Sequence, residues 1–215
     1  MKRTKKIMTL AIAAMLLVST TVAVTVAYLT AETKVVTNTF TVGDVKIGLN
    51  EADVDLYGVK IPDADPERVT ENEYKLIPGH TYVKDPTVYV EKGSEECYVF
   101  VKVENGLTAI ESTDEDYVSI AAQMSGKGWK PLEVDEKDGE NVFYYKDKVN
   151  VLEAKENASL IVFENFTIDG NAVLTDENGE FLYADKEITI DAYAIQADGF
   201  GSAAEAWAAA PSTWE

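Results

Sequence analysis

The sequence contains very few of the side chains that most catalytic and metal sites use. It has one cysteine, Cys97, and one histidine, His80, in 215 residues. A single cysteine cannot form a disulfide within the chain, and a single histidine leaves no zinc site with two imidazole ligands. The His-Glu-x-x-His pattern of zinc peptidases does not occur. A Cys97 nucleophile would need His80 as its base, and the strand-like and turn-like surroundings of these residues give that pairing no support.

Positive charge is also scarce. The chain has 38 acidic and 19 basic residues, for a net charge of −19, and four of the basic residues fall within the first 27 positions. So acidic a surface repels nucleic acid and anionic membranes, which excludes nucleic acid as an expected partner. The hydrophobic content of 46% and the eleven tyrosines are typical of a packed domain rather than of a disordered acidic chain.

The N-terminus has the three parts of a secretory signal peptide. Basic residues come first, an uncharged apolar run covers residues 7–26, and small residues lead to Ala27. This order predicts export and cleavage between Ala27 and Tyr28, or alternatively after Ala31. A retained membrane anchor is the other interpretation, because the apolar run is about long enough to span a bilayer.

Most of the remaining chain alternates polar and apolar residues with period two, the pattern of β-strands. The clearest strand is Cys97 to Val103, whose apolar residues on both faces predict a central place in a sheet. Cys97 is then expected to be a small buried core residue. Pro78-Gly79 predicts a type II turn from Ile77 to His80.

Two short helices interrupt this pattern. Ser112 to Met124 has the spacing of a capping box followed by apolar residues at helical intervals, and Ser202 to Ala208 has a second capping box. Trp207 and Trp214 are expected to cover one end of the fold. The predicted class is all-β, a jelly-roll-like β-sandwich with a short inserted helix, preceded by a signal helix and a free N-terminal strand.

Three segments follow from these patterns. Residues 1–27 are the signal peptide, residues 28–43 an N-terminal arm, and residues 44–215 the β-sandwich domain with its C-terminal helix.

Calcium is the one metal for which the sequence offers candidates. Asp53 and Asp55 form one pair of carboxylates, and Asp63 and Asp65 form another. Neither completes an EF-hand loop. The loop that would start at Asp53 has Ala64 where the bidentate glutamate would be. A solvated acidic surface is the alternative interpretation. The many strand aromatics also leave a carbohydrate-binding surface open as an alternative to a purely structural core.

Several segments together resemble the TasA and camelysin (CalY) group of secreted proteins, which a SipW-type signal peptidase processes. The matching segments are Ala27-Tyr28-Leu29-Thr30, Asn38-Thr39-Phe40-Thr41-Val42-Gly43-Asp44-Val45-Lys46-Ile47, Leu76-Ile77-Pro78-Gly79 and Lys84-Asp85-Pro86-Thr87-Val88. The likeness covers the first half of the chain well. In the second half it consists mainly of strand order.

The resemblance implies a jelly-roll protein of Gram-positive bacteria, located in the extracellular matrix or on the cell surface. It implies a structural role as a biofilm-matrix fibre subunit that associates with itself and with other matrix proteins or polysaccharide. In that family the N-terminal arm inserts into the sheet of the next subunit. The corresponding donor residues here are Tyr28, Leu29, Val35, Val36 and Phe40.

Two other functions remain as alternatives. One is a cell-surface adhesin or a module that binds glycan or calcium. The other is a metalloendopeptidase, a label that camelysin-like proteins have carried, and the lack of a zinc motif in this chain argues against it. No catalytic residue is expected, and calcium is the only cofactor considered.

Overall fold

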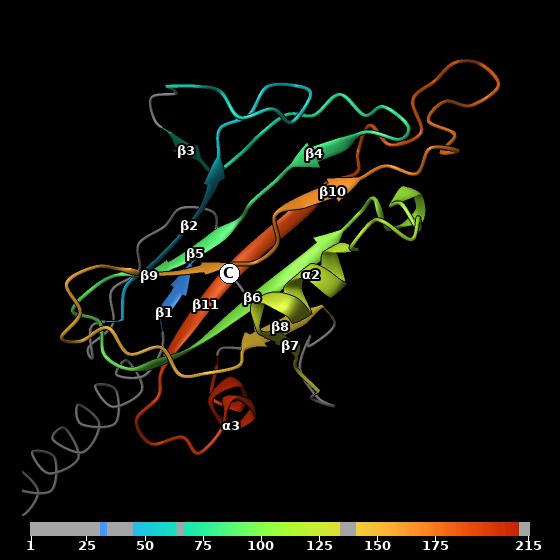
Figure 1. Ribbon diagram of the computed structural model, residues 1–215. Helices are drawn as coiled ribbons and strands as arrows, with labels where there is room; N and C mark the ends of the chain where they lie inside the picture. Colours follow the sequence, from blue (N-terminus) through green and yellow to red (C-terminus); the bar gives the residue numbers. More distant parts are fainter. Residues whose placement is uncertain (1–30, 34–44, 64–66, 134–140, 211–215) are drawn as a thin grey trace, which may run out of the picture.

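The computed structural model of the protein describes residues 31–33, 45–63, 67–133 and 141–210, and these segments form three antiparallel sheets (Figure 1). The first sheet has the order β1-β11-β6-β8-β7, with strands Ala31–Thr33, Ile188–Gln196, Cys97–Asn105, Val142–Tyr145 and Trp129–Pro131. The second has the order β3-β2-β5-β9, with strands Arg68–Val69, Ile47–Ala52, Thr87–Val90 and Ala158–Ile161. The third pairs β10 (Asn165–Thr167) with β4 (Thr81–Val83). The predicted all-β class is confirmed.

One hydrophobic core joins the three sheets. It contains Val99 and Val101 from β6, Val88 from β5 and the stacked rings of Tyr82 and Phe166 from the two-stranded sheet, whose centroids lie 4.9 Å apart. Cys97 belongs to this core and has no exposed surface, as the sequence predicts. Burial raises the pKa of its thiol to about 12, with the nearby charge of Glu96 as a smaller cause. Cys97 is therefore a neutral packing residue at physiological pH.

A second core covers the opposite face of the five-stranded sheet. Because side chains alternate along a strand, Tyr98 and Phe100 of β6 point away from the first core. They pack with α3 (Ala203–Ala208), which lies against this sheet at the bottom of Figure 1. The ring centroids of Phe100 and Trp207 lie 5.1 Å apart. The expectation that Trp207 covers one end of the fold is wrong, because it covers a sheet face. Trp214 lies outside the described residues.

The inserted helix is shorter and begins later than the sequence predicts. α2 spans Ile120–Lys127, and Ser119 caps it by accepting a hydrogen bond from the Ala122 N–H at 3.3 Å. Ser112, the expected cap, is buried and accepts a bond from the Asp114 N–H in a local turn instead. A one-turn 3₁₀ helix, η1, lies just before it at Thr108–Ile110. The C-terminal helix agrees with its prediction, since Ser202 accepts from the Glu205 N–H.

The type II turn at residues 77–80 is confirmed. Gly79 has a φ of 75°, and the His80 N–H donates to the Ile77 carbonyl at 3.1 Å. Across residues 31–33, 45–63, 67–133 and 141–210, no helix has the length and apolar character of a membrane span. The predicted signal peptide and its Ala27–Tyr28 cleavage point lie outside these residues.

Candidate functional site

The outer edge of the five-stranded sheet is formed by a piece of the N-terminal arm. β1 pairs antiparallel with β11, with Ala31 opposite Ala194 and Thr33 opposite Ala192 (Figure 1). The prediction of a free N-terminal strand is wrong for these three residues, because they already pair with the chain's own sheet. The predicted donor residues lie outside the described part of the chain: Tyr28, Leu29, Val35, Val36 and Phe40.

The opposite edge of the same sheet is formed by β7, which is poorly suited to accept a further strand. The Leu132 N–H donates to the Val142 carbonyl of β8 at 2.9 Å. Since successive N–H groups of a strand point to opposite sides, the nitrogen of Pro131 faces the outer edge, where it offers no donor. Lys130 and Pro131 are both exposed there. Proline and lysine on an edge strand are common protections against unwanted pairing.

A buried polar cluster lies where β2 meets the segment that follows β3. Glu51 of β2 is only 4% exposed, and its carboxylate accepts bonds from Lys84 Nζ at 2.8 Å and 3.1 Å. The same carboxylate accepts a bond from Asn72 Nδ2 at 2.9 Å. Both donors share the Oε1 atom of Glu51. A carboxylate at this depth requires such partners, because an unpaired buried charge is strongly destabilising.

The amide of Asn72 is held in one orientation by the backbone. Its Nδ2 also donates to the Ala52 carbonyl at 3.0 Å, and its Oδ1 accepts from the Val54 N–H at 3.1 Å. A rotated amide would place like groups against each other at both contacts. The positions of the amide oxygen and nitrogen are therefore fixed relative to Glu51 and Lys84.

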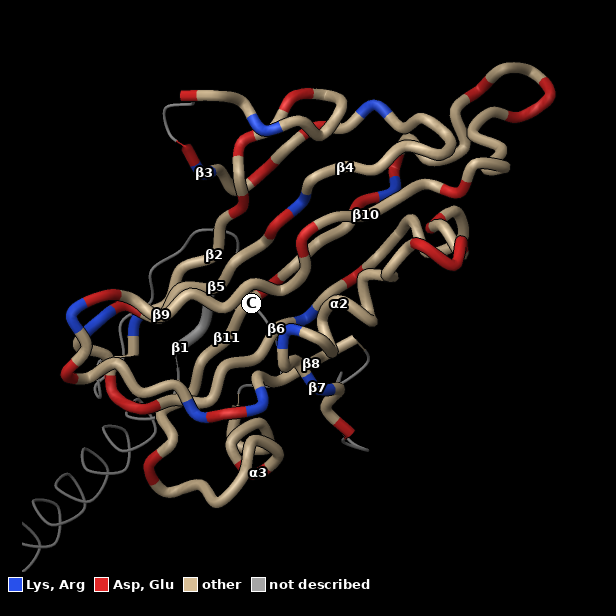
Figure 2. Tube along the Cα trace, viewed as in Figure 1, with Lys and Arg blue, Asp and Glu red and all other residues tan. Residues whose placement is uncertain are grey.

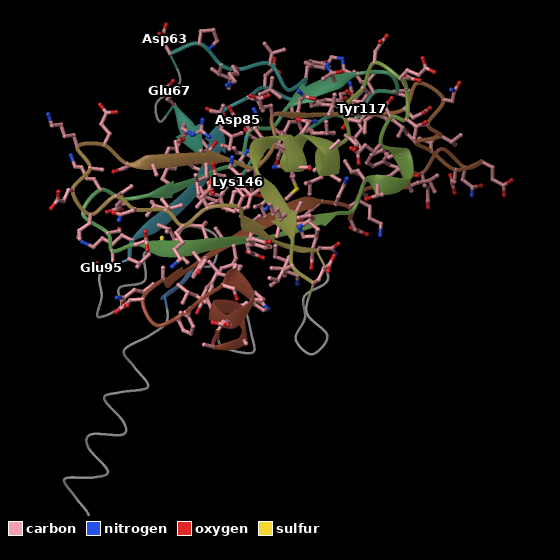
Figure 3. The ribbon with its side chains drawn as sticks, turned by 60° about the horizontal axis from the view of Figure 1, so that its bottom comes forward. Asp63, Glu67, Asp85, Glu95, Tyr117 and Lys146 are labelled. Carbon is pink, nitrogen blue, oxygen red and sulfur yellow. The ribbon has the colours of Figure 1, made fainter. Side chains whose placement is uncertain are left out.

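Asp85, labelled in Figure 3, organises a second ionic group beside this cluster. Its carboxylate accepts from the Ala52 N–H at 2.7 Å and from Lys60 Nζ at 2.8 Å, and it pairs with Arg68. Burial alone would raise the pKa of Asp85. The hydrogen bonds from Lys60 and the Ala52 N–H, with the nearby positive charges, outweigh burial and hold this pKa below its usual value.

Tyr74 closes one side of the buried cluster. Its ring centroid lies 5.8 Å from Lys84 Nζ, and its hydroxyl donates to the Val83 carbonyl at 3.1 Å. The ring also makes an edge contact with Phe166 of the main core. Burial, and then the negative charges of Glu51 and Asp85, raise the pKa of Tyr74 far above its usual value. The Tyr74 ring thus links the buried ion pair to the main core.

Among the described residues, the calcium candidates Asp53, Asp55 and Asp63 do not form a group that could hold a metal ion. Asp55 Oδ1 accepts from the Tyr57 and Val59 N–H groups at 2.9 Å, so it stabilises its own turn. Asp65 lies outside the described residues. Within the segments that the structure describes, no group of three or more His, Cys, Asp or Glu side chains could hold a metal ion. Acidic residues instead occur along many of the loops (Figure 2).

Sequence reasoning missed the buried polar cluster because lysine and glutamate are normally surface residues. One signal was present in the pattern of β2. Glu51 shares the face of Ile47 and Leu49, since all three are separated by two positions. A carboxylate in register with an apolar face indicates a buried ion that needs a partner from elsewhere in the chain.

Comparison with known proteins finds no match: no protein-family model, no curated protein and no solved structure matches the chain.

Proposed function

We propose that the chain is an exported structural protein that assembles into fibres by exchanging its N-terminal strand between subunits. On this proposal it is a TasA-type matrix protein with a jelly-roll fold, released by a SipW-type signal peptidase to the matrix or surface of a Gram-positive bacterium. The observation that carries the proposal is the pairing of β1 with β11. A piece of the N-terminal arm is the edge strand of the central sheet.

The position of β1 suits exchange between copies. An edge strand is held on one side by backbone hydrogen bonds that are the same whether the strand comes from its own chain or from another. β11 stays in place meanwhile, because its nine residues pair with β6 on the other side. Strand exchange of this kind is a known route from monomers to assemblies, and a head-to-tail contact that does not close gives a filament.

Paired cysteine variants test the exchange directly. Ala31 and Ala194 are opposite each other, and directly paired residues of antiparallel strands have a Cα spacing within disulfide range. We expect oxidised Ala31→Cys protein mixed with Ala194→Cys protein to give disulfide-linked dimers. The double variant should give linked monomers where the strand stays on its own sheet and a ladder of covalent oligomers where it exchanges. Each single variant alone is the control.

Deletion of residues 28–39 is the second part of the test. Negative-stain micrographs of the processed protein should show filaments. The deletion variant should not form them, while its circular dichroism stays that of a β-protein. A processed protein that remains monomeric at all concentrations, with no mixed disulfide, would refute the proposal. That result would favour the alternative of a cell-surface binding module, which calorimetry with calcium and with a glycan panel then examines.

A further inference from the structure

We propose that Lys84 and Asn72 join through an intramolecular isopeptide bond, which the chain forms by itself with Glu51 as the proton carrier. The proposal does not depend on assembly. It rests on three buried or half-buried side chains that together have the parts of an acyl-transfer site: a nucleophile, an acid–base group and an amide held in a fixed orientation.

The three side chains meet at one atom. Lys84 Nζ and Asn72 Nδ2 both donate to Glu51 Oε1, at 3.1 Å and 2.9 Å. The two nitrogens can therefore lie no farther apart than these two bonds laid end to end, which places the lysine amine near the Asn72 amide. The attack requires the flexible lysine side chain to turn toward the amide carbon of Asn72. The backbone positions the reacting groups in advance, which supplies much of the advantage of an intramolecular reaction.

Each chemical role has a residue. Lys84 gives a proton to Glu51 Oε1 across their 3.1 Å contact, which leaves a neutral amine. The amine attacks Cγ of Asn72 and forms the new C–N bond, and the negative charge that develops on Oδ1 faces the Val54 N–H, which already lies 3.1 Å away. Glu51 passes its proton through Oε1 to Nδ2, the leaving nitrogen.

The step balances without an oxidant or a co-reactant. Glu51 takes the remaining proton from Nζ as the Cγ–Nδ2 bond breaks, and the departing ammonia carries that proton away as ammonium. The ammonium group of Lys84 and the amide of Asn72 thus become one secondary amide and one ammonium ion. Glu51 ends as the carboxylate it was at the start.

The reacting side chains have little contact with solvent. The side chain of Lys84 is 10% exposed and that of Glu51 6% exposed. The Tyr74 ring lies beside the amine, and Tyr74 in turn contacts Phe166 of the main core. Opposite charges this far buried stay in contact with each other, because separation would leave each one unpaired.

Mass spectrometry of a tryptic digest tests the proposal. Trypsin cuts after Arg68, Lys75 and Lys92 but not after an acylated lysine. The purified protein should therefore yield residues 69–75 joined to residues 76–92, with a mass one ammonia below the sum of the two peptides. Fragmentation should place the link between Asn72 and Lys84. Separate peptides of unmodified mass would overturn the proposal.

Three variants separate the roles. Lys84→Arg keeps the positive charge but removes the amine that would attack Asn72. Glu51→Gln keeps the shape of the side chain but cannot carry the proton. We expect the linked peptide to be absent from both variants. Lys60→Arg is the matched control, since Lys60 belongs to the neighbouring Asp85 group and should leave the link intact. A fully linked Glu51→Gln protein would refute the role of Glu51. Whether the bond forms at all is decided by the digest of the protein without substitutions.

Discussion

The hydroxyl of Tyr82 should stabilise the fold more than a single side-chain group usually does. Tyr82 has no exposed surface, and its oxygen accepts from the Ile77 N–H and donates to the Lys75 carbonyl, both at 2.7 Å. Tyr82→Phe removes both bonds and keeps the ring, which stacks on Phe166. A buried backbone group left without a partner costs about 1–3 kcal/mol. Because Lys75 and Ile77 are exposed residues, water can partly replace the hydroxyl. We therefore expect a loss at the lower end of this range for each bond, about 2 kcal/mol in total.

Urea unfolding followed by tryptophan fluorescence measures this loss. The midpoint should fall while the slope stays unchanged, because the native surface is nearly the same. A domain of this size should also melt roughly 4–8 °C lower. Tyr74→Phe is the matched control, since it removes one hydroxyl that makes one longer bond, and it should cost about 1 kcal/mol. A loss below about 0.5 kcal/mol for Tyr82→Phe would refute the argument from paired backbone groups.

Three further predictions follow from burial and charge. The pKa of Asp85 is lowered in the folded protein, so its stabilising contribution is present above its unfolded pKa and is lost as the pH falls through the folded value. Urea titrations from neutral to acidic pH should show this loss of stability. The Asp85→Asn variant should lack this part of the pH dependence. Cys97 should stay unreactive toward a thiol reagent in the folded protein, because its thiol is buried and its pKa is raised to about 12. It should react rapidly in denaturant. Fast labelling of the folded protein would contradict this prediction. Trp207→Ala should lower the free energy of unfolding by about 3–5 kcal/mol, because Trp207 is 4% exposed and contacts Phe100. Trp207→Phe should lower it by clearly less. Equal losses in the two variants would show that α3 packs loosely.

The central strands could be predicted from the sequence because their pattern is local. β6 is apolar on both faces and lies between β11 and β8, as its residues indicate. The sequence did not show what covers its second face, since α3 reaches it from about one hundred residues further along the chain. Nor did it place α2. Ser112 and Ser119 are both adequate caps, and the choice depends on Glu111, whose carboxylate accepts from the Ile120 N–H.

The candidate sites were predictable to different degrees. The arm was expected to be β-prone, and residues 31–33 do form a strand, but only the folded sheet shows that they pair with β11. The cluster of Glu51, Asn72 and Lys84 depends on contacts between residues 21 and 33 positions apart. No spacing rule for helices or strands relates residues at such distances, so only the tertiary fold brings them together.

The difference between the two edges of the five-stranded sheet limits the architecture of any polymer this chain forms. The β11 edge takes a strand from the arm, whereas the β7 edge carries Lys130 and Pro131. Each subunit then has one acceptor and one donor through this sheet, a valency of two. Units of valency two grow into unbranched threads with a defined direction, and a gel would need crosslinks from other molecules. Chain length would then respond sharply to any species that has an acceptor edge but no arm, since one such unit ends a thread.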